Sequence, residues 1–240
     1  YTLSLHDALP IETVGGFTAN ASDLATVRSA IVAPDETVGS PRGCYLDFPD
    51  LEPEVASACR TAAEKFAAPA DASTRAQLLG AFAGNVDTYN QIVAADAWSV
   101  HRRWAERYRD RYDPAVWQRL QRGAIQTPAD HERALRELAQ VQSVWRDYFA
   151  SFDFLILPAT PFGALTKADC TLANRIRLLR LTAPASLGGL PVLTVPVALD
   201  SGLTSGLQII VRDRQSSVLP WALALSAADS ARPDPDSSHQ

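Results

Sequence analysis

The chain has 240 residues, of which 47% are hydrophobic and 20% are charged, and its formal net charge is −5. This composition is ordinary for a soluble globular protein, and one domain is the expected organisation at this length. Arginines stand mainly beside acidic residues on helix-like segments, so there is no basic stripe and nucleic-acid binding is not expected.

The cysteines and the apolar runs indicate the cellular setting. Cys44, Cys59 and Cys170 are odd in number and lack C-x-x-C spacing, which favours reduced thiols in the cytoplasm over a disulfide framework or a metal site. The longest apolar runs, such as residues 195–199, fall far short of the ~20 residues that a membrane span requires. No membrane segment and no metal are therefore expected.

Both ends are predicted to lie outside the folded domain. Residues 1–11 lack the features of a signal peptide and resemble a translated sequencing adapter, so we interpret them as a non-native extension. Residues 229–240 belong to a polar, proline-containing stretch, which predicts a disordered tail. The domain is expected to cover residues 12–228.

The first elements in chain order are predicted to be a helix, a strand and a second helix. Asn20 or Ser22 can cap a helix that ends near Pro34. Its apolar face consists of Leu24, Val27, Ala30 and Ile31. Residues 38–46 can supply a strand, and Pro53 begins the next helix.

The middle of the chain is predicted to be helical. Residues 74–98 are rich in apolar side chains, and Trp104, Tyr108 and Tyr112 recur at every fourth position. A helix would place these three rings on one face, so we interpret them as core residues.

A long helix and a buried strand are predicted next. Thr127 followed by Pro128 is typical of an N-cap and a first helical turn, and apolar residues continue at helical spacing as far as Phe149. Residues 153–158 are apolar at their centre and end in proline, which predicts a strand buried on both faces.

The last predicted elements are two helices and a strand hairpin. Thr171 is expected to begin one helix, and Thr182 is expected to cap a second, shorter helix. The glycine pair at residues 188–189 is expected to end this second helix, because glycine adopts the left-handed conformation readily. Residues 192–199 and 207–212 are expected to be strands joined by a turn. The sequence thus predicts one α/β layer structure with a mixed sheet.

Three segments resemble, in this order, the amidase signature family. Residues 13–16 with Asp23 are similar to the family's glycine-proline block, although two of its usual residues are replaced. Residues 153–161, DFLILPATP, are similar to its buried strand and pocket loop. Residues 181–211 are similar to its terminal helix, glycine pair and strand hairpin.

The resemblance implies a three-layer α/β/α fold and hydrolysis of a carboxamide C–N bond by a serine, a second serine on a cis peptide, and a lysine. A serine hydroxyl alone is a poor nucleophile, so a neutral lysine would draw its proton through the second serine. Backbone N–H groups would stabilise the oxyanion. No cofactor is implied, and the implied substrate is a small-molecule amide.

The triad cannot be assigned to any residue of this chain. Lys65 and Lys167 are the only lysines, neither follows a Ser-x-x-Lys pattern, and no Gly-x-Ser-x-Gly occurs. We expect the triad upstream of Thr13, and therefore interpret the chain as the C-terminal part of an amidase, inactive alone. The alternative is a truncated, non-catalytic protein of amidase ancestry that binds or scaffolds through its helical middle; homodimerisation is left open.

Thr160, Pro161 and Gln208 are the candidate substrate-binding residues. Thr160 and Pro161 follow the carboxyl end of a predicted strand, where α/β proteins place their pockets, and the resemblance puts them near the acyl site. Turn formation is the alternative role for both. Gln208 is the polar residue of an apolar strand, at a position where the family often has glutamine; a structural hydrogen bond within the hairpin is the alternative.

Arg175, Arg177 and Arg180 suggest either a clamp for an acidic substrate or three surface arginines. In the tRNA-linked amidotransferase branch of the family an acidic residue is expected near position 179, where this chain has leucine. The sequence therefore argues against that branch.

Overall fold

The computed structural model describes residues 15–32 and 40–230, and within these ranges the chain forms eight α-helices and a four-stranded sheet. The strands lie in the order β1 (Gly43–Tyr45), β2 (Phe154–Pro158), β4 (Thr204–Val211) and β3 (Val192–Ala198). β1 is parallel to β2, whereas β4 is antiparallel to both of its neighbours. Predictions for residues 1–14, 33–39 and 231–240 fall outside the described residues.

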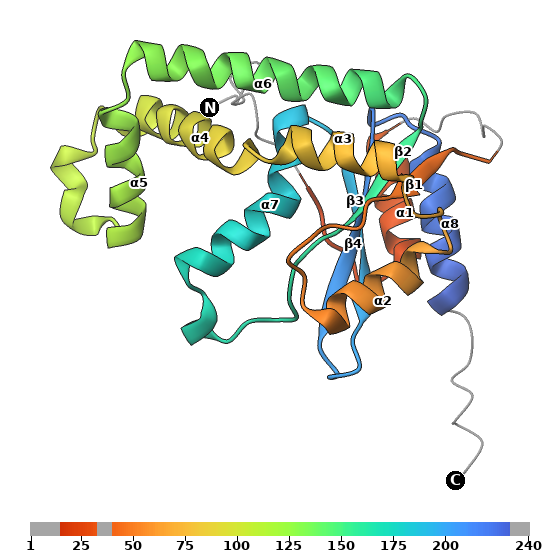
Figure 1. Ribbon diagram of the computed structural model, residues 1–240. Coiled ribbons are helices and arrows are strands. Elements are labelled where there is room, and N and C mark those ends of the chain that lie inside the picture. Colours follow the sequence, from red (N-terminus) through yellow and green to blue (C-terminus); the bar gives the residue numbers. More distant parts are fainter. Residues whose placement is uncertain (1–14, 33–39, 231–240) are drawn as a thin grey trace, which may run out of the picture.

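Helices cover both faces of this sheet (Figure 1). One face carries α3 (Ala72–Phe82), α4 (Asn85–His101), α6 (Pro128–Phe149) and α7 (Leu172–Gly188). The other face carries α1 (Ala21–Ile31), α2 (Pro53–Ala63) and α8 (Val218–Ser230). α5 (Pro114–Ala124) packs on α4 and lies away from the sheet. The predicted three-layer α/β/α fold with a mixed sheet is confirmed.

β2 is buried along its whole length, because it has a strand on each side and helices on each face. Leu155 and Leu157 pack into the core beneath α6, whereas Phe154 and Ile156 pack into the core beneath α2 and α8. Each such side chain contributes roughly 1.5–3 kcal/mol by leaving water. The prediction of a strand buried on both faces is confirmed.

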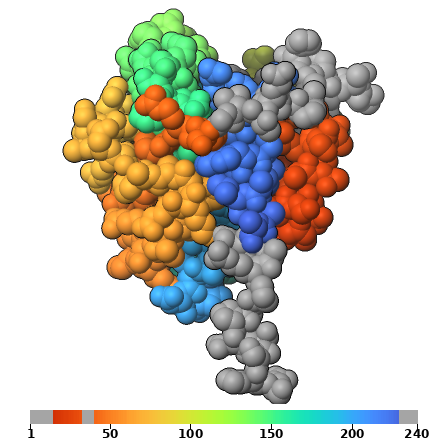
Figure 2. Space-filling view, turned by 90° about the vertical axis from the view of Figure 1, so that its right-hand side faces the viewer, coloured from red at the N-terminus to blue at the C-terminus, as the bar shows by residue number. Residues whose placement is uncertain are grey.

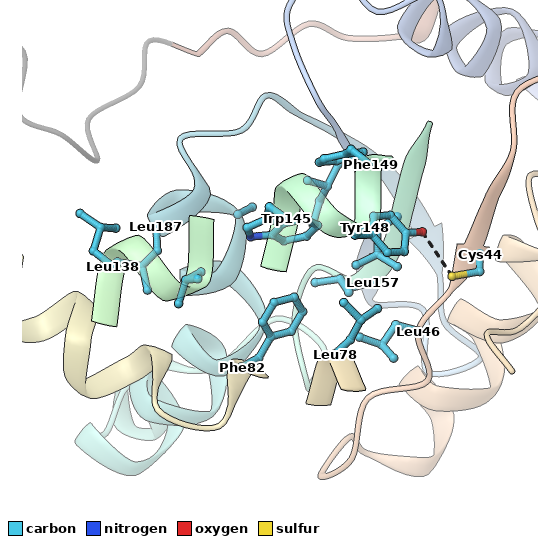
Figure 3. Packing of buried hydrophobic residues seen from close by; sticks show 14 of the residues in the cluster. Cys44, Leu46, Leu78, Phe82, Leu138, Trp145, Tyr148, Phe149, Leu157 and Leu187 are labelled. Atoms are coloured by element: carbon cyan, nitrogen blue, oxygen red, sulfur yellow. Dashed lines mark hydrogen bonds between the residues drawn. The ribbon is translucent and has the colours of Figure 1, made fainter. Parts of the chain in front are cut away.

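The core on the α6 side contains the rings of Trp145, Tyr148 and Phe149 from α6, packed with side chains of neighbouring elements (Figure 3). Trp145 donates from Nε1 to the Pro184 carbonyl at 2.9 Å, which joins α6 to α7. Tyr148 donates from its hydroxyl to the Phe154 carbonyl at 2.7 Å and lies 3.3 Å from the Cys44 sulfur. α6 begins with the predicted N-cap, since the Thr127 hydroxyl accepts from the backbone N–H three residues later.

On the opposite face, α8 lies alongside α1 (Figure 2). Asn20 is the N-cap of α1, since its side-chain oxygen accepts from the Asp23 N–H at 2.9 Å. Leu24 packs against the core, but Val27 and Ile31 are exposed, so the predicted apolar face of this helix is buried only in part.

β3 is an edge strand with one covered face and one open face. Leu193, Val195 and Val197 are buried against the α2 and α8 layer. The alternating residues on the opposite face are exposed: Val192, Thr194, Pro196 and Ala198. The strict alternation shows that no helix of the described chain covers this part of the sheet.

Two local predictions were wrong. Thr182 does not begin a helix but lies inside α7, which runs unbroken from its N-cap Thr171 to Gly189, where φ is 63°. Pro184 removes only one backbone donor, and burial of its neighbours Ala183 and Ala185 holds the helix together across it.

The second error concerns the aromatic stripe. Trp104 and Tyr108 are 39% and 37% exposed, so they are not core residues. The α-helix ends at His101 and a 3-10 helix covers Glu106–Arg111, so a four-residue spacing no longer places side chains on one face. Within the described ranges, no helix combines the length and apolarity needed to cross a bilayer.

Candidate functional site

The candidate site is the loop of residues 159–163, which we call the site loop, at the carboxyl end of β2. Thr160 donates from its hydroxyl to the Phe162 carbonyl at 2.6 Å. The Ser205 hydroxyl, on β4, lies 2.9 Å from the Thr160 hydroxyl oxygen. Since Thr160 has already committed its only hydroxyl hydrogen, Ser205 is the donor in this second bond. The loop is thereby tied to the end of β4.

Two further contacts fix the site loop from the α2 side. Pro161 is buried, and its carbonyl accepts from the Glu52 N–H at 2.9 Å, immediately before α2 begins. The Arg177 guanidinium stands 5.4 Å from the centre of the Phe162 ring, a cation–π contact. The loop is thus held by β4, by the start of α2 and by α7.

Gln208 lies on β4 behind the site loop and is 5% exposed. Its Nε2 donates to the Pro158 carbonyl at 3.0 Å and to the Leu181 carbonyl at 3.1 Å. Both side-chain hydrogens are therefore used by backbone carbonyls of β2 and α7. Gln208 thus has a structural role, but neither partner belongs to the strand hairpin, so the prediction of a bond within the hairpin was wrong.

The three arginines of α7 do not form one clamp. Arg177 and Arg180 both pair with Asp50, at 3.4 and 3.2 Å from its Oδ2, and thereby hold the turn in which Asp50 has a φ of 66°. Arg175 faces α5, where burial and the charges of Arg119 and Arg122 lower its pKa. Arg180 is exposed whereas Arg175 and Arg177 are half-buried, so the alternative of three surface arginines holds only in part.

The thiol nearest to the site loop is not poised for catalysis. The Cys59 sulfur lies 3.7 Å from the carbonyl of Gly206 on β4, a carbonyl that also accepts from the Ala159 N–H of the loop. Burial raises its pKa to about 11, so it stays a neutral thiol at pH 7. Lys65 and Lys167 are both exposed. Among the described residues, no group of three or more His, Cys, Asp or Glu side chains is arranged to hold a metal ion.

Ser205 is the member of this site that the sequence prediction missed. It lies two residues before Leu207, in step with Ile209 and Val211, and these three side chains all point to the α2 side. Extending the two-residue period of the strand by one step would have placed the Ser205 hydroxyl on the same face. The strand was predicted to start at residue 207, two residues beyond Ser205.

Comparison with known proteins identifies the family of the chain. The family model for Amidase matches residues 43–217. A glutamyl-tRNA(Gln) amidotransferase subunit from Symbiobacterium thermophilum is 31% identical over 140 residues, which are 54% of this chain and 28% of that protein. Fatty acid amide hydrolase of Medicago truncatula is 32% identical over 106 residues, which are 41% of this chain and 16% of that protein. The chain spans less than a third of the length of these relatives.

A crystal structure of an amidase shares the fold, with a TM-score of 0.70 and 22% identity over 90% of this chain and 52% of that one. The first segment of sequence resemblance, residues 13–16 with Asp23, lies outside the matched range and stays a prediction. The second and third segments, residues 153–161 and 181–211, lie within it. The chain therefore belongs to the Amidase family, the amidase signature enzymes.

Proposed function

We propose that the whole protein hydrolyses the C–N bond of a small linear carboxamide and that this chain supplies one wall of its substrate pocket. The observation that carries the proposal is the site loop, which follows the central strand and is held from three sides within the range that the family model matches. A loop fixed in this way can orient a substrate without rearranging.

In the proposed reaction a serine oxygen attacks the amide carbon, and its proton passes through a second serine, on a cis peptide, to a neutral lysine. The proton then reaches the departing amine as the C–N bond breaks, and water hydrolyses the acyl-enzyme. Backbone N–H groups stabilise the oxyanion in both steps. No metal or organic cofactor takes part in this scheme.

The serines and the lysine of this scheme are proposed to belong to a part of the whole protein that covers the open face of β3. Two observations support this arrangement: Val192 and Thr194 are exposed on that face, and both lysines of the chain are exposed on other segments. The 240 residues by themselves are proposed to be inactive.

Thr160 and Pro161 are proposed to line the acyl side of the pocket, and Gln208 to position them. Gln208 ties the last residue of β2 to α7, so it fixes the point from which the site loop departs. Loss of this bond is expected to move the loop and not merely to remove a contact with the substrate.

The proposed setting is the cytoplasm, and a homodimer is the proposed assembly. Cys44 and Cys59 are buried free thiols, which suits a reducing compartment. The homodimer is proposed for the isolated chain, in which the open face of β3 is free to meet a second copy.

A second candidate function is binding without catalysis, through the helical middle. The observation that favours it is the exposed ring of Tyr108, over which the guanidinium groups of Arg107 and Arg111 stand at 5.4 and 5.2 Å. Exposed aromatic and arginine side chains are enriched at protein interfaces.

Ammonia release from a panel of small primary carboxamides tests the proposal. The purified 240-residue chain is expected to release none above buffer, whereas the longer reading frame that contains it is expected to be active. In that longer protein, Thr160→Val is expected to lower kcat/KM at least ~10-fold because the site loop shifts, while Thr204→Val, at an exposed position of β4, leaves it unchanged.

Each alternative has its own outcome. Turnover by the 240-residue chain that survives repurification contradicts the proposed inactivity. An inactive longer protein contradicts the amidase proposal and favours the binding function.

A further inference from the structure

A cavity of about 630 Å³ lies between the junction of α3 with α4 and the facing side of α6. Its walls carry backbone at Gly80 and Gly84 and polar side chains from two facing helices. These side chains are Asn85, Asp87, Thr88, Gln91, Arg133, Glu137 and Gln140. The cavity shares no residue with the site loop, Ser205 or Gln208.

The floor of the cavity contains hydrogen-bonding groups that the described chain leaves unused. Asn85 is 1% exposed, yet its side-chain nitrogen has no partner among the described residues. The side-chain oxygen of Gln91, farther along α4, is likewise buried without a partner. Leaving a buried polar group unsatisfied costs about 1–3 kcal/mol, so each of these two atoms calls for a partner. Both residues belong to the lining of the cavity.

The start of α4 lies at the cavity wall. Asn85 is the first residue of this helix, and Gly84, the residue before it, has no side chain that could act as a cap. The Asp87 and Thr88 N–H groups both donate to the Gly84 carbonyl, at 3.1 and 3.2 Å. The unused donor at this end of the helix is therefore the side-chain nitrogen of Asn85.

The opposite wall is acidic. Glu137, on α6, is half-buried, and its Oε2 accepts from the Thr88 hydroxyl at 2.7 Å, which fixes the carboxylate at the cavity wall. Asp87, on α4 and so on the same side as Asn85, adds a second carboxylate. The arginine in the lining, Arg133, is paired with Asp130 at 3.0 Å. The cavity thus holds more negative than positive charge and favours a cation.

We propose that this cavity binds a small organic cation in which a protonated amine stands next to a carbonyl group. The amine donates to the Glu137 carboxylate and the Gln91 oxygen, and the carbonyl oxygen accepts from the Asn85 side-chain nitrogen. This site is additional to the proposed amide hydrolysis and does not depend on it.

Glycinamide is the probe, because it carries both an ammonium and a carboxamide group. Acetamide and methylammonium, which each carry one of the two, are its matched controls. Titration of the ¹⁵N-labelled 240-residue chain, followed at the Asn85 side-chain amide resonance, is expected to saturate with glycinamide. Acetamide and methylammonium are expected to bind at least ~10-fold more weakly, since each loses one charged or polar contact.

Two variants on α6 distinguish binding in the cavity from a nonspecific effect of surface charge. Glu137→Gln keeps an acceptor for Thr88 but removes the charge, and is expected to weaken glycinamide binding at least ~10-fold. Glu132→Gln makes the same change on α6 at a side chain that is 70% exposed, and is expected to leave binding unchanged. Circular dichroism checks that both variants fold, and Gln91→Leu replaces Glu137→Gln if the latter does not.

Three results overturn the proposal. They are the absence of saturable shifts with glycinamide, equal binding of all three probes, and equal weakening by the Glu132 and Glu137 changes. The first shows that water alone satisfies Asn85 and Gln91. Because no result requires turnover, failure here is distinguishable from failure of the proposed amidase activity.

Discussion

Gln208 holds together elements that are distant along the chain. The carbonyls that it reaches, on Pro158 and Leu181, are 50 and 27 residues away. A polar residue in an apolar strand could be identified from the sequence alone. Its partners could not, because nothing near position 208 indicates which helix will pack on this face of the sheet.

Gln208→Leu is expected to lower the free energy of unfolding by ~2 kcal/mol, because two buried carbonyls lose a donor while the volume of the side chain is nearly kept. Urea denaturation measures the change. Gln215→Leu, at an exposed position after β4, is the matched control and is expected to stay within ~0.5 kcal/mol of the parent. An equal change in the free energy of unfolding in both variants would show that the two hydrogen bonds of Gln208 do not stabilise the fold.

Cys59 makes stability depend on pH in the alkaline range. Burial raises its pKa from the ordinary value of 9.0 to about 11 in the folded chain. Between these values the unfolded thiol loses its proton while the folded thiol keeps it. The free energy of unfolding is therefore highest below pH 9 and falls as the pH rises toward 11, by up to ~3 kcal/mol. Urea midpoints between pH 8 and 10.5 should fall less steeply in Cys59→Ala than in the parent; parallel curves would contradict this assignment.

At the scale of elements, α4 and α5 approach each other closely at Gly123. A Cβ atom at this position would collide with the Ala94 carbonyl oxygen of α4. Glycine is therefore required here by the contact between two helices, and not by an unusual backbone angle. Gly80, in α3, has no atom within 4 Å of the corresponding position.

Substitution of these two glycines should change stability in opposite directions. Gly123→Ala is expected to destabilise the chain by ~1–3 kcal/mol, because one helix backbone must move. Gly80→Ala is expected to stabilise it by ~0.5–1 kcal/mol, because alanine favours the helix and meets no neighbour. Thermal melting of both variants measures the difference, and a shift of the same sign in both would disprove the close approach.

The elements that the sequence predicted well are those with strong local signals. The cap at Thr127, the apolar run of β2 and the glycine pair at the end of α7 each specify a boundary within a few residues. α8 was missed because its own apolar residues are distributed around the whole helix, so its sequence shows no amphipathic period. α7 was divided in two because the packing that carries it across Pro184 comes from Trp145, 39 residues earlier.

At the scale of the whole molecule, the sheet is covered on both faces except along β3. Val192 is 39% exposed and the strand has a free edge. Unpaired backbone groups beside an open face are a template for pairing with another strand. The fold class was predictable from the order of elements. The uncovered face of β3 was not, because alternation of apolar and polar residues does not show on which side of the sheet the open face of a strand lies.

The isolated chain is expected to self-associate through β3 and to lose solubility as its concentration rises. Size-exclusion chromatography with light scattering should show a dimer or larger species whose fraction rises with concentration. Val192→Lys combined with Thr194→Lys should shift it toward monomer, because like charges meet across the pairing. A sharp monomer peak from the parent chain, with a cooperative melt, would contradict the expectation.

The position of β1 has a consequence for the order of events during synthesis. Gly43 pairs with Phe154, so strands that are neighbours in the sheet are separated by most of the helical part of the chain. Contacts between such distant segments form slowly, and ribosomes add about 5–20 residues per second. β1 must therefore wait several seconds, without its partner, until β2 leaves the ribosome. During that interval Cys44 and Tyr45, which end up buried beneath two different layers, are open to chaperones and to oxidants.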